Sequence, residues 1–203
     1  MGIRQTKKEQ RRLAIEEAAL AMFLAEGYER TSVERIAEQV GMARGTFYLY
    51  YPDKLALFEE LCGRLYSPMV EVLENTARAL HMAASIHEHQ FIYLSMAGGM
   101  ANLGPQLQPF LGLHFREVRS AGPAGEVVAR WLARIESLGE GILRDAAERG
   151  LLTIHDAYTV VLAIIGAVER LTWAWLSGDP RLDRDRAALE LSAVFFRGLH
   201  GVE

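Results

Sequence analysis

The stretch that decides the fold of this chain is Thr31–Lys54, TSVERIAEQVGMARGTFYLYYPDK. Its first half carries apolar residues at positions i, i+3, i+4 and i+7, the pattern of one face of an α-helix: Val33, Ile36, Ala37 and Val40. Thr31 or Ser32 can cap the start of this helix, and Thr31 with Glu34 has the spacing of a capping box. Gly41 stands where a left-handed residue would end the helix. The pattern predicts a short helix with clear start and stop signals.

A second helix of about two turns is expected over residues 43–50, after a tight turn. Phe47 can supply its buried side, and four hydrogen-bonding side chains are left to point elsewhere: Arg44, Thr46, Tyr48 and Tyr50. Such groups donate to phosphates, Arg44 can also read a guanine edge, and Gly45 would let the backbone approach DNA closely. The two helices predict a helix-turn-helix whose second helix enters a major groove. The alternative is a small helical hairpin with polar surface groups.

Lys54 follows Asp53, which is a good N-cap for a third, longer helix. A lysine in the first turn of a helix opposes the helix macrodipole. A phosphate bound there would contact both the lysine and the free N–H groups. The lysine at this position would then stabilise the bound phosphate, which offsets its unfavourable interaction with the macrodipole. We therefore expect Lys54 to contact a DNA phosphate.

The stretch resembles the DNA-binding domain of the TetR family of bacterial transcriptional regulators. The matching positions are Thr31-Ser32-Val33, Ile36-Ala37, Gly41, Gly45-Thr46-Phe47-Tyr48, Tyr50-Tyr51 and Lys54. The resemblance implies phosphate contacts from four places: the helix start at Thr31 and Ser32, then Thr46, Tyr50 and Lys54. It implies contacts at or near the bases from Arg44, Gly45 and Tyr48. One departure is Ala43, where a serine cap is common in the family.

Length and charge set limits on the rest of the chain. The 203 residues are half hydrophobic, which is enough for one or two domains with a sizeable core. The net charge of −4 argues against a molecule that binds nucleic acid over its whole surface. The first twelve residues are nevertheless basic: Arg4, Lys7, Lys8, Arg11 and Arg12 against Glu9. This arm can reach phosphate or the minor groove, or it is a solubilising tail.

Cysteine content and hydropathy indicate a soluble, cytoplasmic protein. The single cysteine, Cys62, excludes an intramolecular disulfide and fits a reducing compartment. It shares a face with apolar residues of the expected third helix, so we interpret it as a small buried hydrophobe rather than a redox switch. The charged first dozen residues do not resemble a signal peptide. The most apolar run, Ala157–Val168, is too short to span a bilayer, so no membrane partner is expected.

The fold class expected is all-α, with about nine helices and no strands, because no long stretch alternates apolar and polar residues. The helices are expected near residues 7–26, 33–40, 43–50, 54–80, 87–102, 109–119, 124–149, 157–177 and 183–198. Residues 1–53 would form the helix-turn-helix domain. Residues 54–203 would form a helical regulatory, ligand-binding and dimerisation domain, with the helix over 54–80 acting as a lever between the two.

The last two expected helices are apolar nearly all the way round, and such a helix must be buried on all sides. A second copy of the chain can supply part of that burial through a two-fold four-helix bundle, and the TetR resemblance also implies a homodimer. A deep core within one chain is the alternative. The residues expected in the dimer interface are Ala163, Ile164, Ala167, Val168, Leu171, Trp175, Leu191, Phe195 and Leu199.

A cavity for a small apolar or aromatic molecule is plausible in the expected bundle. Its candidate lining residues are Phe91, Tyr93, Met96, Met100, His114, Phe115, Trp131 and Trp173, which would otherwise be ordinary core. Three histidines, His81, His87 and His89, are interpreted as surface residues near a helix start, because no ligand set completes a metal site around them. No phosphate loop, nucleophile elbow or spaced carboxylate pair is visible, so we expect neither an enzyme nor a metal or cofactor.

These observations predict a ligand-responsive transcriptional repressor. A homodimer would bind a near-palindromic double-stranded DNA operator and leave it when a small-molecule effector binds. Two alternatives stay open: a DNA-binding regulator without an effector, and a helical ligand carrier or enzyme that contains a similar hairpin by chance.

Overall fold

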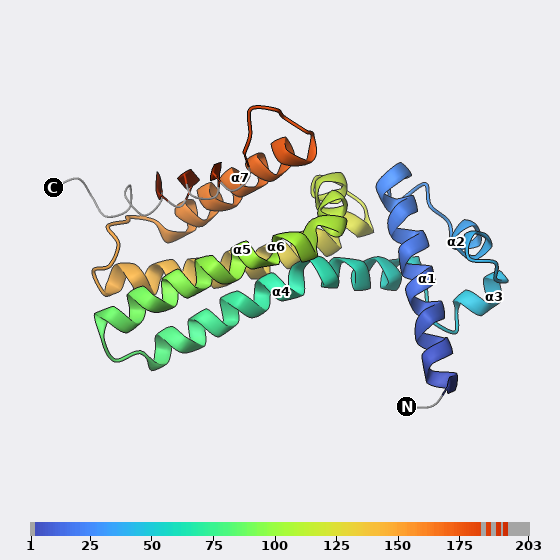
Figure 1. Cartoon of the computed structure of the whole chain (residues 1–203), viewed down its shortest axis with the longest axis horizontal. Helices are drawn as coiled ribbons and strands as arrows, with labels where there is room; N and C mark the ends of the chain where they lie inside the picture. The colour runs from blue at the N-terminus through green and yellow to red at the C-terminus, as the bar shows by residue number, and fades with distance from the viewer. Residues whose placement is uncertain (1–2, 184–185, 188–189, 192, 195–203) are drawn as a thin grey trace. The chain divides into compact units, whose positions relative to one another are not determined.

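The computed structural model describes residues 3–183, 186–187, 190–191 and 193–194. These residues contain seven helices and no strand, which confirms the all-α fold (Figure 1). The helix expected over 183–198 falls largely outside them. The chain forms two compact units: unit 1 comprises residues 1–68 and 104–131, and unit 2 comprises residues 69–103 and 132–203. The domain boundary expected after Asp53 stays a prediction.

The first two helices begin and end close to the expected positions. Helix α1 spans Ile3–Glu26, and Gly27 follows it with a φ of +89°. Helix α2 spans Val33–Gln39 and ends before Gly41, whose φ is +64°. A left-handed backbone at both stops is the conformation that glycine adopts without a steric penalty. The capping box at Thr31 is wrong: Ser32 is the N-cap, and its hydroxyl accepts from the Arg35 N–H at 3.3 Å.

Helix α3 is shorter than expected. It spans Arg44–Phe47, and residues 48–50 continue as turns rather than helix. Ala43 at its start provides no side-chain cap. At its end Tyr51 precedes Pro52, and a residue before proline is disfavoured in the helical conformation. In the described structure α2 and α3 both lie on one side of α1 (Figure 1).

An aromatic and aliphatic core holds unit 1 together. Phe23, Tyr28 and Phe58 pack with ring centroids 5.2–5.7 Å apart. Around them lie residues with at most 1% of their surface exposed: Ile15, Ala19, Ile36, Ala37, Phe47, Leu57, Leu61, Cys62 and Leu65. Cys62 is fully buried, as expected for a small hydrophobe, and burial raises the pKa of its thiol to about 12. The helix-turn-helix therefore stands on a closely packed frame.

Three long helices follow. Helix α4 spans Lys54–Met82, with the Ala56 N–H donating to the Asp53 carboxylate at 2.8 Å, as expected of an N-cap. Helix α5 spans Ile86–Glu117, so the break expected at residues 102–105 and the separate helix over 109–119 are wrong. Pro105 and Pro109 lie inside α5; each removes one N–H donor, and the helix continues through both. Helix α6 spans Pro123–Glu148, close to the expected range.

The end of α5 is fastened to the end of α1 within unit 1. The Arg116 guanidinium donates to the carbonyls of Leu24 and Ala25 at 3.2 and 3.3 Å. The neighbouring Glu117 carboxylate accepts from the Tyr28 N–H at 3.0 Å. A cation at a helix C-terminus also interacts favourably with the helix dipole. These contacts fix the connection that leads from α1 into the helix-turn-helix.

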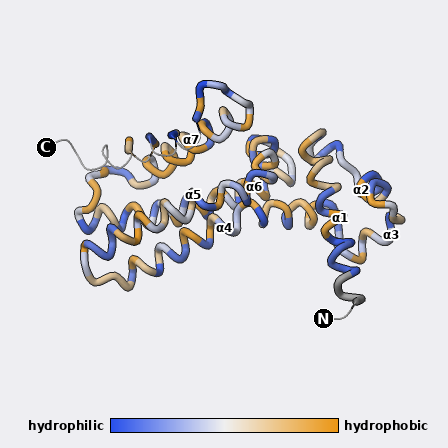
Figure 2. The backbone as a smooth tube through the Cα atoms, in the orientation of Figure 1, coloured by the Kyte–Doolittle hydropathy of each residue, from blue (hydrophilic) through white to orange (hydrophobic). Residues whose placement is uncertain are grey.

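Helix α7 spans Ala157–Leu176, capped by Asp156, which accepts from the Tyr158 and Thr159 N–H groups. Hydrophobic residues predominate along it (Figure 2), yet Val161 alone among its residues is buried. Of the described helices, α7 is also the one long and apolar enough to cross a membrane by length and composition, since its 20 residues include an 18-residue window with a mean hydropathy of 1.5. The apolar run over residues 157–168 ends at Glu169 and Arg170, and α7 continues past these charged residues to Leu176. Length and composition alone are weak evidence that a helix spans a membrane, since helices at protein interfaces can share them.

Candidate nucleic-acid interface

The short helix α3 presents to solvent most of the side chains expected to reach DNA. The Arg44 side chain is 62% exposed and Tyr48 is 43% exposed, while Thr46 and Tyr50 are half-buried. Gly45 is exposed, and a Cβ added there would meet no atom within 4 Å. None of the described residues therefore requires glycine at position 45. A surface that approaches this position closely, such as a DNA backbone, would favour glycine because glycine has no side chain.

Arg44 is held in place by its neighbours. Its guanidinium lies 2.8 Å from the Glu34 carboxylate on α2 and 3.3 Å from the Tyr48 hydroxyl. The Tyr48 hydrogen bond and then the Glu34 charge raise the pKa of Arg44, so the side chain stays cationic. A fixed, exposed guanidinium suits bidentate reading of a guanine edge. Glu34 opposes phosphate, however, and competes with DNA for the same cation.

Lys54 has a role inside the protein that the sequence did not suggest. Its ammonium donates to the carbonyls of Tyr28 and Thr31 at 2.7 and 2.8 Å, and it lies 4.0 Å from the centre of the Tyr28 ring. Burial lowers the pKa of Lys54. The side chain thereby ties the start of α4 to the loop before α2. One of its three N–H donors is left for a phosphate, and that contact stays a prediction.

The two residues at the start of α2 are placed differently. Thr31 is 2% exposed, and its hydroxyl donates to the Gly27 carbonyl at 2.9 Å. Its N–H donates to the Tyr28 carbonyl at 3.3 Å, so both of its donors are used within the protein. Ser32 is half-buried at the N-cap. Of the two, Ser32 stands closer to solvent for the phosphate contact that the family resemblance implies.

A buried carboxylate behind α3 was missed by the sequence reasoning. Glu16 on α1 is 2% exposed, and it accepts a hydrogen bond of 2.5 Å from the hydroxyl of Tyr51, just after α3. Its other oxygen accepts from Arg64 on α4. The signal was present in the sequence, because Glu16 shares a helical face with Ala19 and Phe23 at spacings of three and four. Charged residues on such a face are buried with partners.

The residues expected to line a ligand cavity are divided between the two units. In unit 1, His114 and Trp131 contact Tyr66, which no sequence pattern singled out, and Phe115 lies against His114. Tyr66 stacks on Trp131 at 5.8 Å, and its hydroxyl lies 2.8 Å from His114 Nδ1. The remaining five residues lie in unit 2: Phe91, Tyr93, Met96, Met100 and Trp173. The structure therefore brings together three of the eight.

Within the unit 2 group, exposure varies widely. Phe91 is 70% exposed and Trp173 is 52% exposed, whereas Met96 and Met100 are half-buried. The Tyr93 hydroxyl donates to the Asp145 carboxylate at 3.3 Å, and burial raises the pKa of this tyrosine. Phe91 and Trp173 thus present large apolar surfaces to solvent in the single chain, which is unlike the wall of a closed cavity.

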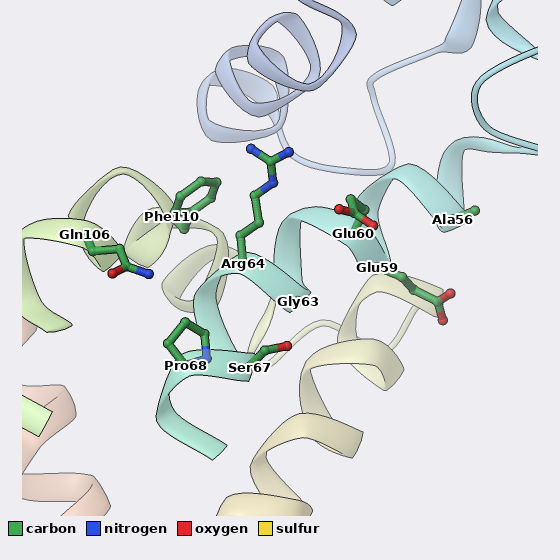
Figure 3. A pocket seen from close by; sticks show the side chains of 9 residues that line it. All are labelled: Ala56, Glu59, Glu60, Gly63, Arg64, Ser67, Pro68, Gln106 and Phe110. Atoms are coloured by element: carbon green, nitrogen blue, oxygen red, sulfur yellow. The ribbon is translucent and has the colours of Figure 1, made fainter. Parts of the chain in front are cut away.

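An open pocket of about 740 Å³ lies elsewhere in unit 1 (Figure 3). Its lining residues come from α4 and α5: Ala56, Glu59, Glu60, Gly63, Arg64, Ser67, Pro68, Gln106 and Phe110. None of the eight expected ligand residues is among them. The charged groups of its wall already have protein partners, since Glu60 pairs with Arg12, Glu59 with Arg130 and Arg64 with Glu16.

The histidines follow the expectation in two cases out of three. His81 and His87 are exposed, but His89 is 2% exposed, so its assignment to the surface is wrong. His89 Nδ1 lies 2.7 Å from the Ser85 carbonyl, one turn earlier in the chain. The ring is therefore anchored to the start of α5 and shielded from solvent.

The residues expected in the dimer interface lie on an exposed helix. On α7, Ala163 and Val168 are exposed, and four more are half-buried: Ile164, Ala167, Leu171 and Trp175. Leu191 is half-buried as well, whereas Phe195 and Leu199 lie outside the described residues. Exposed positions recur along α7 at spacings of three and four: Thr159, Leu162, Ala163, Gly166, Arg170 and Trp173. They form one continuous stripe on the helix.

Comparisons with known proteins identify relatives of this chain. Residues 15–61 match the family of bacterial regulatory proteins, tetR family. The HTH-type transcriptional regulator TcmR of Streptomyces glaucescens is 43% identical over 200 residues, which are 93% of this chain and 84% of that protein.

Two solved structures share the fold. NalD, the secondary repressor of the MexAB-OprM multidrug efflux pump in Pseudomonas aeruginosa, has a TM-score of 0.73 at 24% identity, covering 96% of this chain and 98% of NalD. A complex of SmeT with triclosan has a TM-score of 0.69 at 21% identity, covering 91% of each chain. The relatives are transcriptional regulators, and the chain belongs to the tetR family of bacterial regulatory proteins.

Proposed function

We propose that this DNA-binding transcriptional regulator is a repressor that leaves its operator when a small apolar or aromatic molecule binds. The observation that carries the proposal is the exposed pair of Arg44 on α3 and Tyr48 just after it. Arg44 is also held by Glu34, and the pair is backed by the buried core of unit 1. A guanidinium fixed beside a tyrosine hydroxyl offers donors to a base edge and to phosphate at neighbouring positions. In this proposal Arg44, Gly45 and Tyr48 read the bases, while Ser32, Thr46 and Tyr50 contact phosphates.

The proposed active form is a cytoplasmic homodimer. Two copies of α3 would enter successive major grooves about one helical turn apart, so the operator would be close to a palindrome. The exposed stripe of α7 supports pairing through this helix, because it carries Leu162, Ala163, Gly166 and Trp173 beside the polar Thr159 and Arg170. Ala163 and Gly166 on that stripe are small enough to let a second helix approach closely. TetR regulators bind DNA and small-molecule effectors and are typically dimers.

The effector part of the proposal has two supports. One is the solved complex of SmeT with triclosan, a fold relative with a bound small molecule. The other is the aromatic cluster of Tyr66, His114, Phe115 and Trp131, which joins α4, α5 and α6 within unit 1. A molecule that inserted among these rings would shift the helix that begins at Lys54. The coupling expected between effector and operator is ~1–3 kcal/mol.

The experiment is selection of duplexes from a random-sequence pool by the full-length protein, followed by titration of the enriched duplex in an electrophoretic mobility assay. The expected result is one enriched motif with two inverted half-sites. Enrichment of no motif would contradict the proposal and favour a ligand carrier or enzyme.

A panel of apolar and aromatic compounds, triclosan included, is then added to the preformed complex. Release of DNA at saturating compound supports the repressor mechanism. Unchanged binding throughout the panel would favour a regulator that works without an effector.

A further inference from the structure

A single buried carboxylate joins three elements behind the DNA-reading segment. Glu16 lies on α1, 2% exposed. Its Oε1 accepts from the Tyr51 hydroxyl at 2.5 Å and lies 3.2 Å from Arg12 Nε on the same helix. Its Oε2 accepts from the Arg64 guanidinium of α4. One side chain thus contacts its own helix, the residue that follows the α3 turn, and the long helix α4.

The energetic cost of burying this charge makes its partners important. A carboxylate withdrawn from water is stable only where hydrogen bonds and opposite charges replace its hydration. Arg64 supplies a charged donor and Tyr51 a neutral one. Arg12 Nε is close in distance but makes no well-aligned hydrogen bond, so it contributes through its charge. Removing either true donor leaves a buried carboxylate oxygen unsatisfied.

Tyr51 is suited to remain a donor. Burial, and then its hydrogen bond to Glu16, raise the pKa of the phenol, so its proton stays in place at any physiological pH. Its ring is 6% exposed and packs 6.0 Å from that of Phe47, the buried residue of α3. The position of the Tyr51 ring therefore helps to set the position of α3.

We propose that Glu16 is a positioning residue for DNA reading, which fixes α3 against α1 and α4 through the Tyr51 hydroxyl and the Arg64 guanidinium. The inference rests on the proposed DNA contacts of α3. Sequence-specific contacts tolerate little misplacement, because a bidentate hydrogen bond to a base edge needs a defined distance and direction. Contacts to phosphate are less demanding. Loosening Glu16 should therefore weaken specific binding and leave non-specific binding almost unchanged.

The test uses Tyr51→Phe, which keeps the ring and deletes only the hydroxyl, together with Glu16→Gln and the double variant. Glu17→Gln is the matched control, because Glu17 is the next residue, carries the same charge and is exposed. Dissociation constants are measured for the duplex selected by the wild-type protein and for a random-sequence duplex. Thermal unfolding is followed in parallel, and binding is measured at a temperature where every variant is folded.

The expected result for Tyr51→Phe is about a tenfold weaker binding of the selected duplex, with random-sequence binding within about twofold of wild type. Glu16→Gln replaces the charged acceptor of the Tyr51 hydroxyl with a neutral amide, and Tyr51→Phe removes the donor. Because both changes act on the same hydrogen bond, the double variant should bind about as weakly as Glu16→Gln alone. Glu17→Gln should behave as wild type.

Three outcomes would overturn the proposal. The first is selected-duplex binding by Tyr51→Phe that equals wild type. The second is a parallel loss on both duplexes, as expected if the variants merely contain less folded protein. The third is additive losses in the double variant. A wild-type protein that selects no sequence would instead refute the DNA contacts of α3 and this inference together, and so is distinct from failure of the inference alone.

Discussion

Helix α2 is less apolar than helix α7, yet a larger share of its residues is buried. Three of the seven residues of α2 are buried: Val33, Ile36 and Ala37. Helix α7 is far more apolar, yet Val161 is the one buried residue among its 20. The apolar stripe of an amphipathic helix such as α2 can be buried by neighbours within one chain. Helix α7 is apolar on most sides, and Val161 is the residue of this helix that is buried in the described structure. The comparison separates a helix that packs into the core of its own chain from one that, in the dimer we propose, packs against a second chain.

The largest effect is expected from charging the α7 stripe. Leu162→Glu places a carboxylate on the exposed apolar face, where Leu162 is 42% exposed. Burying that charge between two chains costs about 3 kcal/mol or more. The dimer dissociation constant should therefore rise at least about a hundredfold. Sedimentation velocity over a concentration series measures it.

Met82→Glu is the matched control, because Met82 is 80% exposed at the end of α4. It makes the same kind of change outside the stripe and should leave the dimer intact. Equal weakening by both variants would mean that α7 is not the pairing surface. A wild-type monomer at micromolar concentration would mean the same.

The next effect is expected at α3. Arg44→Ala removes the exposed guanidinium that we assign to a base edge, so binding to the selected duplex should fall about tenfold to a hundredfold. Specificity at one position of each half-site should relax. Binding competition among duplexes that vary at single positions measures both. An equal loss on selected and random DNA would show that Arg44 contacts phosphate instead.

Lys54→Ala should act mainly on stability. The ammonium holds the carbonyls of Tyr28 and Thr31, and loss of these charge-assisted hydrogen bonds should cost about 2 kcal/mol of unfolding free energy. Urea denaturation with a constant m-value measures the loss. If Lys54 also contacts a phosphate, its replacement weakens binding to every duplex and makes the salt dependence less steep. Unchanged stability would contradict the role that its contacts indicate.

The smallest effect is expected from Glu34→Gln. This carboxylate lies 2.8 Å from the Arg44 guanidinium on the exposed side of the helix-turn-helix. Without its charge, Arg44 is freer to meet DNA and repulsion of phosphate falls. Affinity for DNA of any sequence should rise about twofold to threefold at low salt, and the rise should vanish at high salt. A loss of affinity would show that Glu34 is needed to orient Arg44.

Local signals in the sequence predict helix boundaries well where a glycine or a capping side chain decides them. Gly27, Gly41 and Gly150 all adopt positive φ at the expected helix ends, and Asp156 caps α7 at the expected start of that helix. Proline was less decisive, since α5 continues through Pro105 and Pro109. A proline removes a single donor, so packing along the rest of the helix can outweigh it.

The sequence predicted the candidate site only at residues that belong to the helix-turn-helix motif. Exposure of Arg44 and Tyr48 follows from the helix-turn-helix pattern. The roles of Glu16 and Lys54 depend on contacts across 23 or more positions of the chain, which no local pattern specifies. The ligand residues were predicted from aromatic and methionine content alone, and their division between two units shows the limit of composition. His89 was misplaced for the same reason: burial depends on tertiary neighbours.

The central claim is that α3 reads DNA and that α7 pairs two chains. The mass of the protein–DNA complex tests this claim most directly. Sedimentation equilibrium is measured with the selected duplex and with a duplex that retains one half-site. We predict two chains on the full duplex, with binding to the half-site duplex weaker by at least about a hundredfold. One chain per duplex, with equal affinity for the full duplex and the half-site duplex, would contradict the claim that two paired chains bind the operator.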